Sequence, residues 1–219
     1  MARSPRTPPI SSRSRRSGRP PLAHPIVEQL RFTRCEWLRA LRGLTEADGA
    51  KHFGQMNSVG WIVGHLTWQE QRYLLDRPQG IMPRPDIQKE FYSGAAMTTP
   101  SLREMLAAWR SITKKSDAFL DALTTRKLLV DLPFNGRHSG QTQGDAIRRM
   151  TYHYWFHIGE ILAIRQMLGQ KRLPEYVGAI EAKAPYRPDP SRAASAPART
   201  APRARGAKRR RSRAARRAS

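Results

Sequence analysis

The sequence has one cysteine, Cys35, and no apolar run that approaches the roughly 18 residues needed to cross a membrane. A lone cysteine excludes a disulfide within the chain and is in keeping with a reducing, cytoplasmic location. We expect Cys35 to behave as a small buried apolar residue. Prolines interrupt the basic N-terminal stretch, which argues against a secretory signal or an amphipathic transit helix. We therefore predict a cytoplasmic protein that does not enter the membrane.

Acidic residues are also scarce, 17 against 40 Lys and Arg, but the imbalance is uneven along the chain. Residues 1–24 and 187–219 carry net charges of +6 and +11, so most of the overall +23 belongs to the two ends. Both ends lack Phe, Tyr and Trp, and cannot bury enough apolar surface to offset the entropy lost on ordering. We predict disordered basic tails at 1–24 and 185–219 around a single domain at 25–184.

Convincing strands are absent as well, since the best candidate, residues 128–132, is short and isolated. Four longer stretches instead repeat apolar residues at helical spacing, which predicts an all-α four-helix bundle. The connections at 76–98 and 124–141 exceed the usual loop length, so we expect lids or further short helices there. The expected helices are 25–44, 57–75, 99–123 and 142–168, with a short fifth near 174–183.

Each expected helix begins at a residue that favours a helix start. Pro25 suits the first helical position, while Asn57, Thr99 and Thr142 are capping residues. Asp145 follows Thr142 at the spacing of a capping box. The apolar stripe expected along the first helix consists of Ile26, Leu30, Cys35, Leu38 and Leu41.

Three histidines stand out among the apolar positions. His153 and His157 lie four residues apart in an aromatic run, and His65 lies in an earlier apolar run beside Gly60 and Gly64, which leave room for close approach. Residues i and i+4 share one helix face about 6 Å apart, close enough to bind one ion. Three imidazoles with an open fourth position form the ligand set of a catalytic metal. The alternative is three core histidines bonded to backbone or carboxylate groups, and spacing alone leaves both interpretations open.

Two short motifs carry a resemblance to a known family. The run Asn57–Leu66 resembles the first signature of the DinB-like (DinB/YfiT) metalloprotein superfamily. The run His153–Glu160, followed by Arg165 and Leu168-Gly169, resembles the second signature. The resemblance extends over about residues 25–175, with the two motifs in the order expected for a single bundle.

This resemblance implies a four-helix bundle in which His65, His153 and His157 hold a divalent transition metal. It also implies an enzyme of the thiol S-transferase or hydrolase type that acts on a small-molecule substrate with a low-molecular-weight thiol, and a homodimer by analogy. Imidazole ligands suit zinc, nickel and iron alike, so the ligand set does not name the metal.

Five further residues are considered for roles near this site. Glu160 stands where relatives often have Gln, and a carboxylate there can orient a ligand imidazole or act as an acid or base. Trp61, Arg72 and Arg165 are candidates for substrate binding, although either arginine can equally pair with a buried acid. Glu70 lies on the same helix as His65, and its default interpretation is a solvated face.

The alternative to an enzyme is a basic bundle that binds nucleic acid or another polyanion through its tails. Lys208, Arg209, Arg210 and Arg211 form the densest part of the C-terminal charge run. Without aromatic residues the tails offer no stacking surface, so binding is expected to be non-specific, phosphate-driven and strongly dependent on salt. A solvated extension without a partner is the other interpretation of this run.

Overall fold

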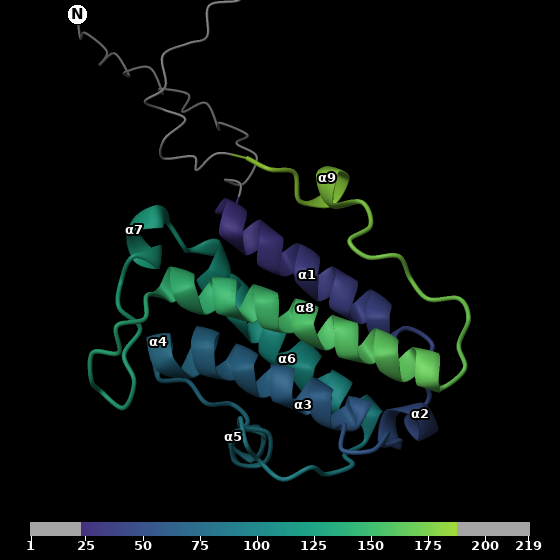
Figure 1. Ribbon diagram of the computed structural model, residues 1–219. Helices are drawn as coiled ribbons and strands as arrows, with labels where there is room; N and C mark the ends of the chain where they lie inside the picture. Colours follow the sequence, from purple (N-terminus) through teal and green to yellow (C-terminus); the bar gives the residue numbers. More distant parts are fainter. Residues whose placement is uncertain (1–22, 188–219) are drawn as a thin grey trace, which may run out of the picture.

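The computed structural model describes residues 23–187, and this part of the chain is helical without a β-strand. In Figure 1, α1, α8 and α3 lie side by side, with α6 behind them. The closest packing is between α3 and α6 and between α1 and α8. The all-α prediction is confirmed. The long helices are α1 (Pro25–Leu41), α3 (Val59–Glu70), α6 (Leu102–Asp121) and α8 (Gln143–Met167).

Short helices occupy the long connections, as predicted. The strand candidate at 128–132 forms no strand, and makes only an isolated bridge between Asp131 and Thr142. None of the helices in the described part of the chain is both long and apolar enough to cross a membrane. The predicted tails lie almost wholly outside the described residues. The short elements are α2 (Glu46–Ala50), the π-helix η1 (Gln71–Asp76), α4 (Arg77–Gln79), α5 (Pro85–Glu90), α7 (Thr125–Leu128) and α9 (Ile180–Lys183).

Two of the predicted helix starts are confirmed. Pro25 is the first residue of α1. At α8 the Thr142 hydroxyl accepts the Asp145 amide at 3.1 Å, while the Asp145 carboxylate accepts the Thr142 amide at 3.1 Å. This reciprocal pair satisfies two of the amides that a helix start leaves without partners. It therefore holds the start of the helix that carries two of the three histidines.

The other two predicted caps are wrong by one or two residues. α3 is capped by Ser58 rather than Asn57, and the Ser58 hydroxyl accepts the amide of Trp61 at 3.2 Å. α6 is capped by Ser101 rather than Thr99. In both places two capping residues stand close together in the sequence. Which one has the extended backbone of a cap is decided by the path of the preceding loop.

The buried face of α1 also differs from the predicted stripe. Cys35 is exposed and Leu38 is 37% exposed, so both lie outside the core. Trp37 takes the central place instead, fully buried and edge-on to the ring of Tyr154 at 5.8 Å. The bulkiest apolar side chain determines which face of the helix is buried, because it has the most surface to remove from water. The buried apolar residues of α1 are Val27, Leu30, Phe32, Trp37, Ala40 and Leu41.

Every residue of α3 is buried. Gly60 and Gly64 make this possible, because a Cβ at Gly60 would lie 2.3 Å from the Pro100 carbonyl oxygen and one at Gly64 would lie 2.6 Å from the Phe91 ring. The close approach predicted at these two glycines is confirmed. His65 is therefore held by a helix that is enclosed on all sides.

Candidate metal centre

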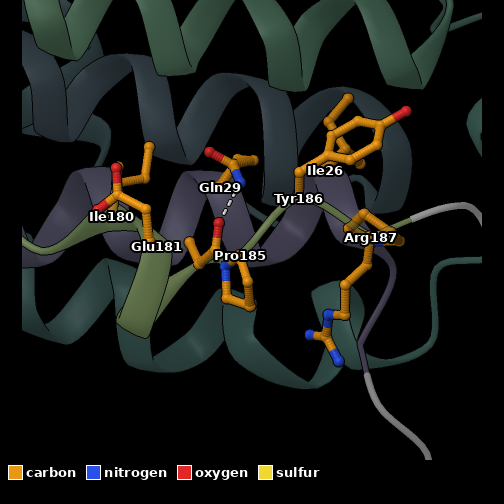
Figure 2. Close-up of a pocket in the computed structure, with 9 residues that line it drawn as sticks. Ile26, Gln29, Ile180, Glu181, Pro185, Tyr186 and Arg187 are labelled. Carbon is orange, nitrogen blue, oxygen red and sulfur yellow. Dashed lines mark hydrogen bonds between the residues drawn. The ribbon is translucent and has the colours of Figure 1, made fainter. Parts of the chain in front are cut away.

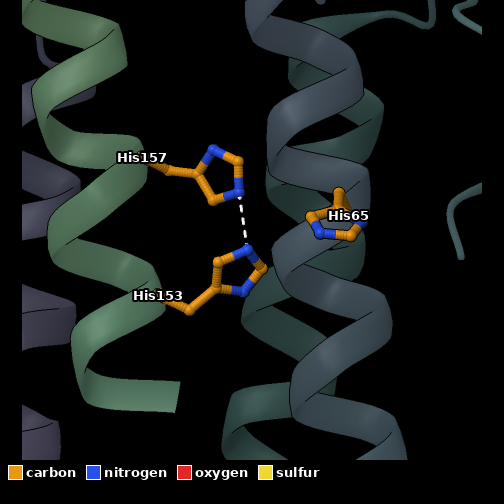
Figure 3. Close-up of side chains that lie close together, drawn as sticks. All are labelled: His65, His153 and His157. Carbon is orange, nitrogen blue, oxygen red and sulfur yellow. Dashed lines mark hydrogen bonds between the residues drawn. The ribbon is translucent and has the colours of Figure 1, made fainter. Parts of the chain in front are cut away.

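The structure brings together the three histidines selected from the sequence (Figure 3). His65 projects from the middle of α3, while His153 and His157 project from successive turns of α8. One ring nitrogen from each histidine can be chosen so that all three lie within 4.8 Å of one another. The ring centroids of His65 are 5.0 Å from His153 and 5.5 Å from His157. Two separate stretches of chain thus meet at one point.

A hydrogen-bond acceptor faces the Nδ1 atom of each ring. His65 Nδ1 lies 2.8 Å from the Phe91 carbonyl oxygen. His153 Nδ1 lies 2.7 Å from the side-chain oxygen of Gln69, and His157 Nδ1 contacts a carboxylate oxygen of Glu160. An acceptor at Nδ1 places the proton on that nitrogen and leaves the lone pair on Nε2. In each ring, Nε2 is then the atom available to a metal.

The Nε2 atoms of His153 and His157 are better arranged to bind a cation than to form a hydrogen bond with each other. His153 Nε2 and His157 Nε2 are 2.9 Å apart, and with both protons on Nδ1 neither nitrogen has a hydrogen to donate. Two lone pairs at this separation repel each other, and a cation between them removes the repulsion. Two nitrogens bound tetrahedrally to one ion lie roughly 3.3 Å apart, given metal–nitrogen distances of about 2.0–2.1 Å. Small side-chain adjustments satisfy this spacing.

Burial keeps the rings of His65 and His153 neutral, as metal ligation requires. Burial lowers the pKa of His153 to about 3, and the positive charges that His157, His65 and Arg149 can carry act in the same direction. Burial also lowers the pKa of His65, although its hydrogen bond to Phe91 opposes the shift. The imidazoles of His65 and His153 therefore remain unprotonated near neutral pH.

Two tryptophans form the wall behind His65. Trp61 stacks on its ring at 5.0 Å and Trp68 at 5.3 Å. Both indoles are fixed by their N–H groups, which donate to the Ala96 carbonyl oxygen at 3.0 Å and to the Gln88 side chain at 2.9 Å. The two stacked indoles make one side of the site rigid and apolar.

A buried polar network lies directly behind the histidines. Arg34 donates two hydrogen bonds to Glu70, at 2.8 and 2.6 Å. Tyr154 donates to the same carboxylate at 2.8 Å and accepts a 2.6 Å bond from the indole of Trp109. The network joins α1, α3, α6 and α8. Glu70 and Tyr154 directly follow Gln69 and His153 in the sequence, so the network sets the register of the two helices that carry the ligands.

The expectation that Glu70 is solvated is wrong, since its side chain is fully buried. Its helix is buried on every side, so a carboxylate within it needs a buried cation. Arg34 lies on the predicted apolar side of the first helix, and this was the sequence signal for a buried acidic partner. Burial, followed by the charge of Glu70, raises the pKa of Tyr154 well above its usual value, so Tyr154 stays a donor to the carboxylate.

The remaining candidates from the sequence lie at different distances from the triad. Glu160 contacts His157 and keeps 32% of its side chain exposed. Arg72 lies over the ring of Trp68, with 5.1 Å between its Cζ and the ring centroid. Arg165 is buried two helical turns beyond His157, where it donates to the Ala40 carbonyl oxygen at 2.5 Å. Lys208, Arg209, Arg210 and Arg211 lie outside the described residues.

A separate cavity of about 510 Å³ lies where α1 meets the C-terminal segment (Figure 2). Gln29 donates there to the Ala184 carbonyl oxygen at 3.0 Å, and Tyr186 is almost fully exposed. None of the three clustered histidines lines this cavity. It contains no converging set of chemical groups, so the histidine cluster remains the candidate site.

The fold and the site together define a helical protein with a three-histidine site suited to a metal. The sequence matches the DinB superfamily over residues 29–161, a span that contains His65, His153 and His157. The chain therefore belongs to the DinB superfamily, as the two motifs predicted. A search of curated proteins found no match to the chain.

Proposed function

We propose that the protein is a metal-dependent enzyme of the thiol S-transferase or hydrolase type. His65, His153 and His157 would hold a divalent transition metal such as zinc, nickel or iron through Nε2, with a coordination position left open. A divalent ion in such a site lowers the pKa of a thiol or a water molecule and so supplies a nucleophile at neutral pH. The observation that carries the proposal is the convergence of one ring nitrogen from each of three histidines whose Nδ1 partners are all in place.

Glu160 is the group that we assign to proton handling. Its carboxylate holds the Nδ1 proton of His157, which fixes the orientation of that ring. A third of the Glu160 side chain is exposed, so one oxygen can also accept a proton from a group entering the site. Trp61 and Trp68 exclude water on the opposite side through their stacking on His65.

Metal analysis of the purified full chain tests the proposal. We expect about one equivalent of a divalent transition metal, and its loss in His65→Ala and His153→Ala, because two imidazoles alone bind far more weakly. His52→Ala is the matched control, since His52 is exposed and bonds to Met56 and Thr99 instead. A wild-type protein that takes up no metal when zinc, nickel or iron is supplied would contradict the proposal.

A screen of low-molecular-weight thiols against electrophiles then identifies the reaction. Turnover that requires both the metal and a thiol would assign an S-transferase, and turnover with water alone would assign a hydrolase. Glu160→Gln keeps an acceptor for His157 but removes the base. We expect it to lower turnover by about 10²–10⁴-fold if Glu160 transfers the proton.

The charge distribution favours a second, separable function. The net charges of +6 at 1–24 and +11 at 187–219 suit binding to a polyanion such as nucleic acid. We expect weak, sequence-independent DNA binding that falls steeply between low and high salt and disappears when both ends are removed. DNA binding that persists in residues 25–186 would contradict this assignment.

A further inference from the structure

Arg72 is a cation held by aromatic rings rather than by an acid. Its Cζ lies 5.1 Å from the ring centroid of Trp68, 5.7 Å from Tyr73 and 5.0 Å from Phe134. Within residues 23–187 its guanidinium has no hydrogen bond or ion pair. Stacking on rings fixes the position of a guanidinium while leaving its N–H donors free. The side chain is therefore positioned, charged and available to an anion.

Arg149 lies at the same level on the facing helix. The Gln69–His153 contact at 2.7 Å and the bond of 3.2 Å from Gln143 to the Tyr73 carbonyl oxygen show that α8 runs antiparallel to α3 and η1. Arg72 lies three residues after Gln69, and Arg149 lies four residues before His153. Both arginines are therefore about one helical turn beyond the level of His153, in the same direction.

Arg149 is also exposed and uncommitted. It lines a shallow cavity of about 550 Å³ together with Arg148 and Tyr152, and its guanidinium has no hydrogen bond or ion pair to another described residue. It is close enough to be one of the charges that act on the His153 ring. Arg149 therefore borders open space one helical turn before His153.

The acidic groups nearby are already engaged. Asp145 caps α8 through Thr142 at 2.7 Å. Asp131 accepts the backbone amide of Gly140 at 3.0 Å, and Glu160 holds His157. Among residues 23–187, neither Arg72 nor Arg149 forms an ion pair with these carboxylates or with any other.

We propose that Arg72 and Arg149 form an anion subsite for the carboxylate or phosphate oxygens of a small-molecule substrate. The anion would lie about one helical turn beyond His153, a rise of about 5–6 Å along the helix axis. Guanidinium groups bind such oxygens by paired, charge-assisted hydrogen bonds. Placing the reacting end of the substrate at the histidines depends on the proposed function, whereas anion binding by the arginines does not.

The first test uses the full chain loaded with Co²⁺ and two thiols of equal length, 4-mercaptobutanoate and 4-mercaptobutan-1-ol. The sulfur-to-cobalt charge-transfer absorption reports the dissociation constant of each thiol. We expect the carboxylate thiol to bind at least about 10-fold tighter, the scale of one charged hydrogen bond. Arg72→Gln and Arg149→Gln should each remove most of this preference and leave the affinity of the alcohol unchanged.

Arg148→Gln is the matched control, because it removes the same charge from the adjacent residue, which is paired with Asp145 at 4.0 Å. It should retain the preference. An unchanged preference in both Arg72→Gln and Arg149→Gln, or an equal loss in Arg148→Gln, would overturn the subsite.

The second test separates the subsite from the metal. Metal-free protein is titrated with inorganic phosphate and with succinate while the arginine Nε–H signals are followed by NMR. Saturable shifts of the Arg72 and Arg149 signals would support the subsite even if Co²⁺ fails to bind, an outcome that would refute only the proposed function. The anion that binds more tightly shows whether the subsite prefers phosphate or carboxylate oxygens. Absence of saturation with both anions would overturn the subsite.

Discussion

At the scale of single residues, the acceptors behind the imidazoles matter as much as the imidazoles themselves. Gln69, Glu160 and the Phe91 carbonyl oxygen each fix one ring in the tautomer that leaves Nε2 free. Such partners orient metal ligands and raise their basicity. The spacing of His65, His153 and His157 could be recognised in the sequence, but the identity of Gln69 as a partner could not, because it depends on how α3 faces α8.

Gln69→Leu should weaken metal binding by about 10–100-fold, because the Nδ1 proton of His153 loses its acceptor. A competition titration with a chelator measures the change. Gln71→Leu is the control, since Gln71 is equally buried but bonds to the backbone of Arg84 at 2.8 and 2.9 Å. It should reduce stability without reducing metal affinity. Equal metal affinities in the two variants would contradict the assigned role of Gln69.

At the scale of the elements, two helices supply all three ligands, and a close contact holds each in place. On α3, Gly64 contacts the ring of Phe91. The backbone carbonyl oxygen of Phe91 in turn accepts the hydrogen bond that orients His65. On α8 it is the capping box at Thr142. The capping box and the small residue were both recognisable from the sequence, since each depends on local chemistry. The π-helix η1 was not, because its wider turn follows from packing that the local sequence does not encode.

Gly64→Ala should destabilise the protein by about 1–3 kcal/mol, because the added Cβ would meet ring atoms of Phe91 at 2.6–2.8 Å. The displaced Phe91 should also weaken metal binding through His65. Gly159→Ala is the matched control on α8, where no atom lies within 4 Å of the added Cβ. It should stabilise the helix by up to about 1 kcal/mol. Urea unfolding of the metal-free variants measures both changes in stability. Similar changes at Gly64 and Gly159 would contradict the predicted clash with Phe91.

At the scale of the whole molecule, the Arg34–Glu70–Tyr154–Trp109 network joins the four long helices through buried hydrogen bonds. Burying an ion pair has a desolvation cost that its attraction only partly offsets, so such a pair contributes less to stability than to a unique arrangement. Here the arrangement that it specifies is the register of α3 against α8, on which the metal centre depends.

Arg34→Met should cost about 3–5 kcal/mol, because it leaves the Glu70 carboxylate buried without its cation. Arg31→Met, one turn earlier on α1, removes an arginine that is a third exposed and paired with Asp121 at 2.8 Å. It should cost less than about 1 kcal/mol. Thermal unfolding compares the two. The double variant Arg34→Met with Glu70→Leu should regain part of the lost stability. If Arg34→Met cost no more stability than Arg31→Met, the role of the network would be contradicted.

The sequence by itself determined the helical class, the places where the helices begin within one or two residues, and the three histidines. These follow from local chemistry: the period of the apolar residues, the hydrogen bonds of a cap, and the spacing of ligands on one turn. Only the tertiary structure decided that Cys35 faces outward, that Glu70 is buried against Arg34, and that Gln69 holds His153. Each of these depends on which faces of separate helices meet, and that is settled by the packing of large side chains far apart in the chain.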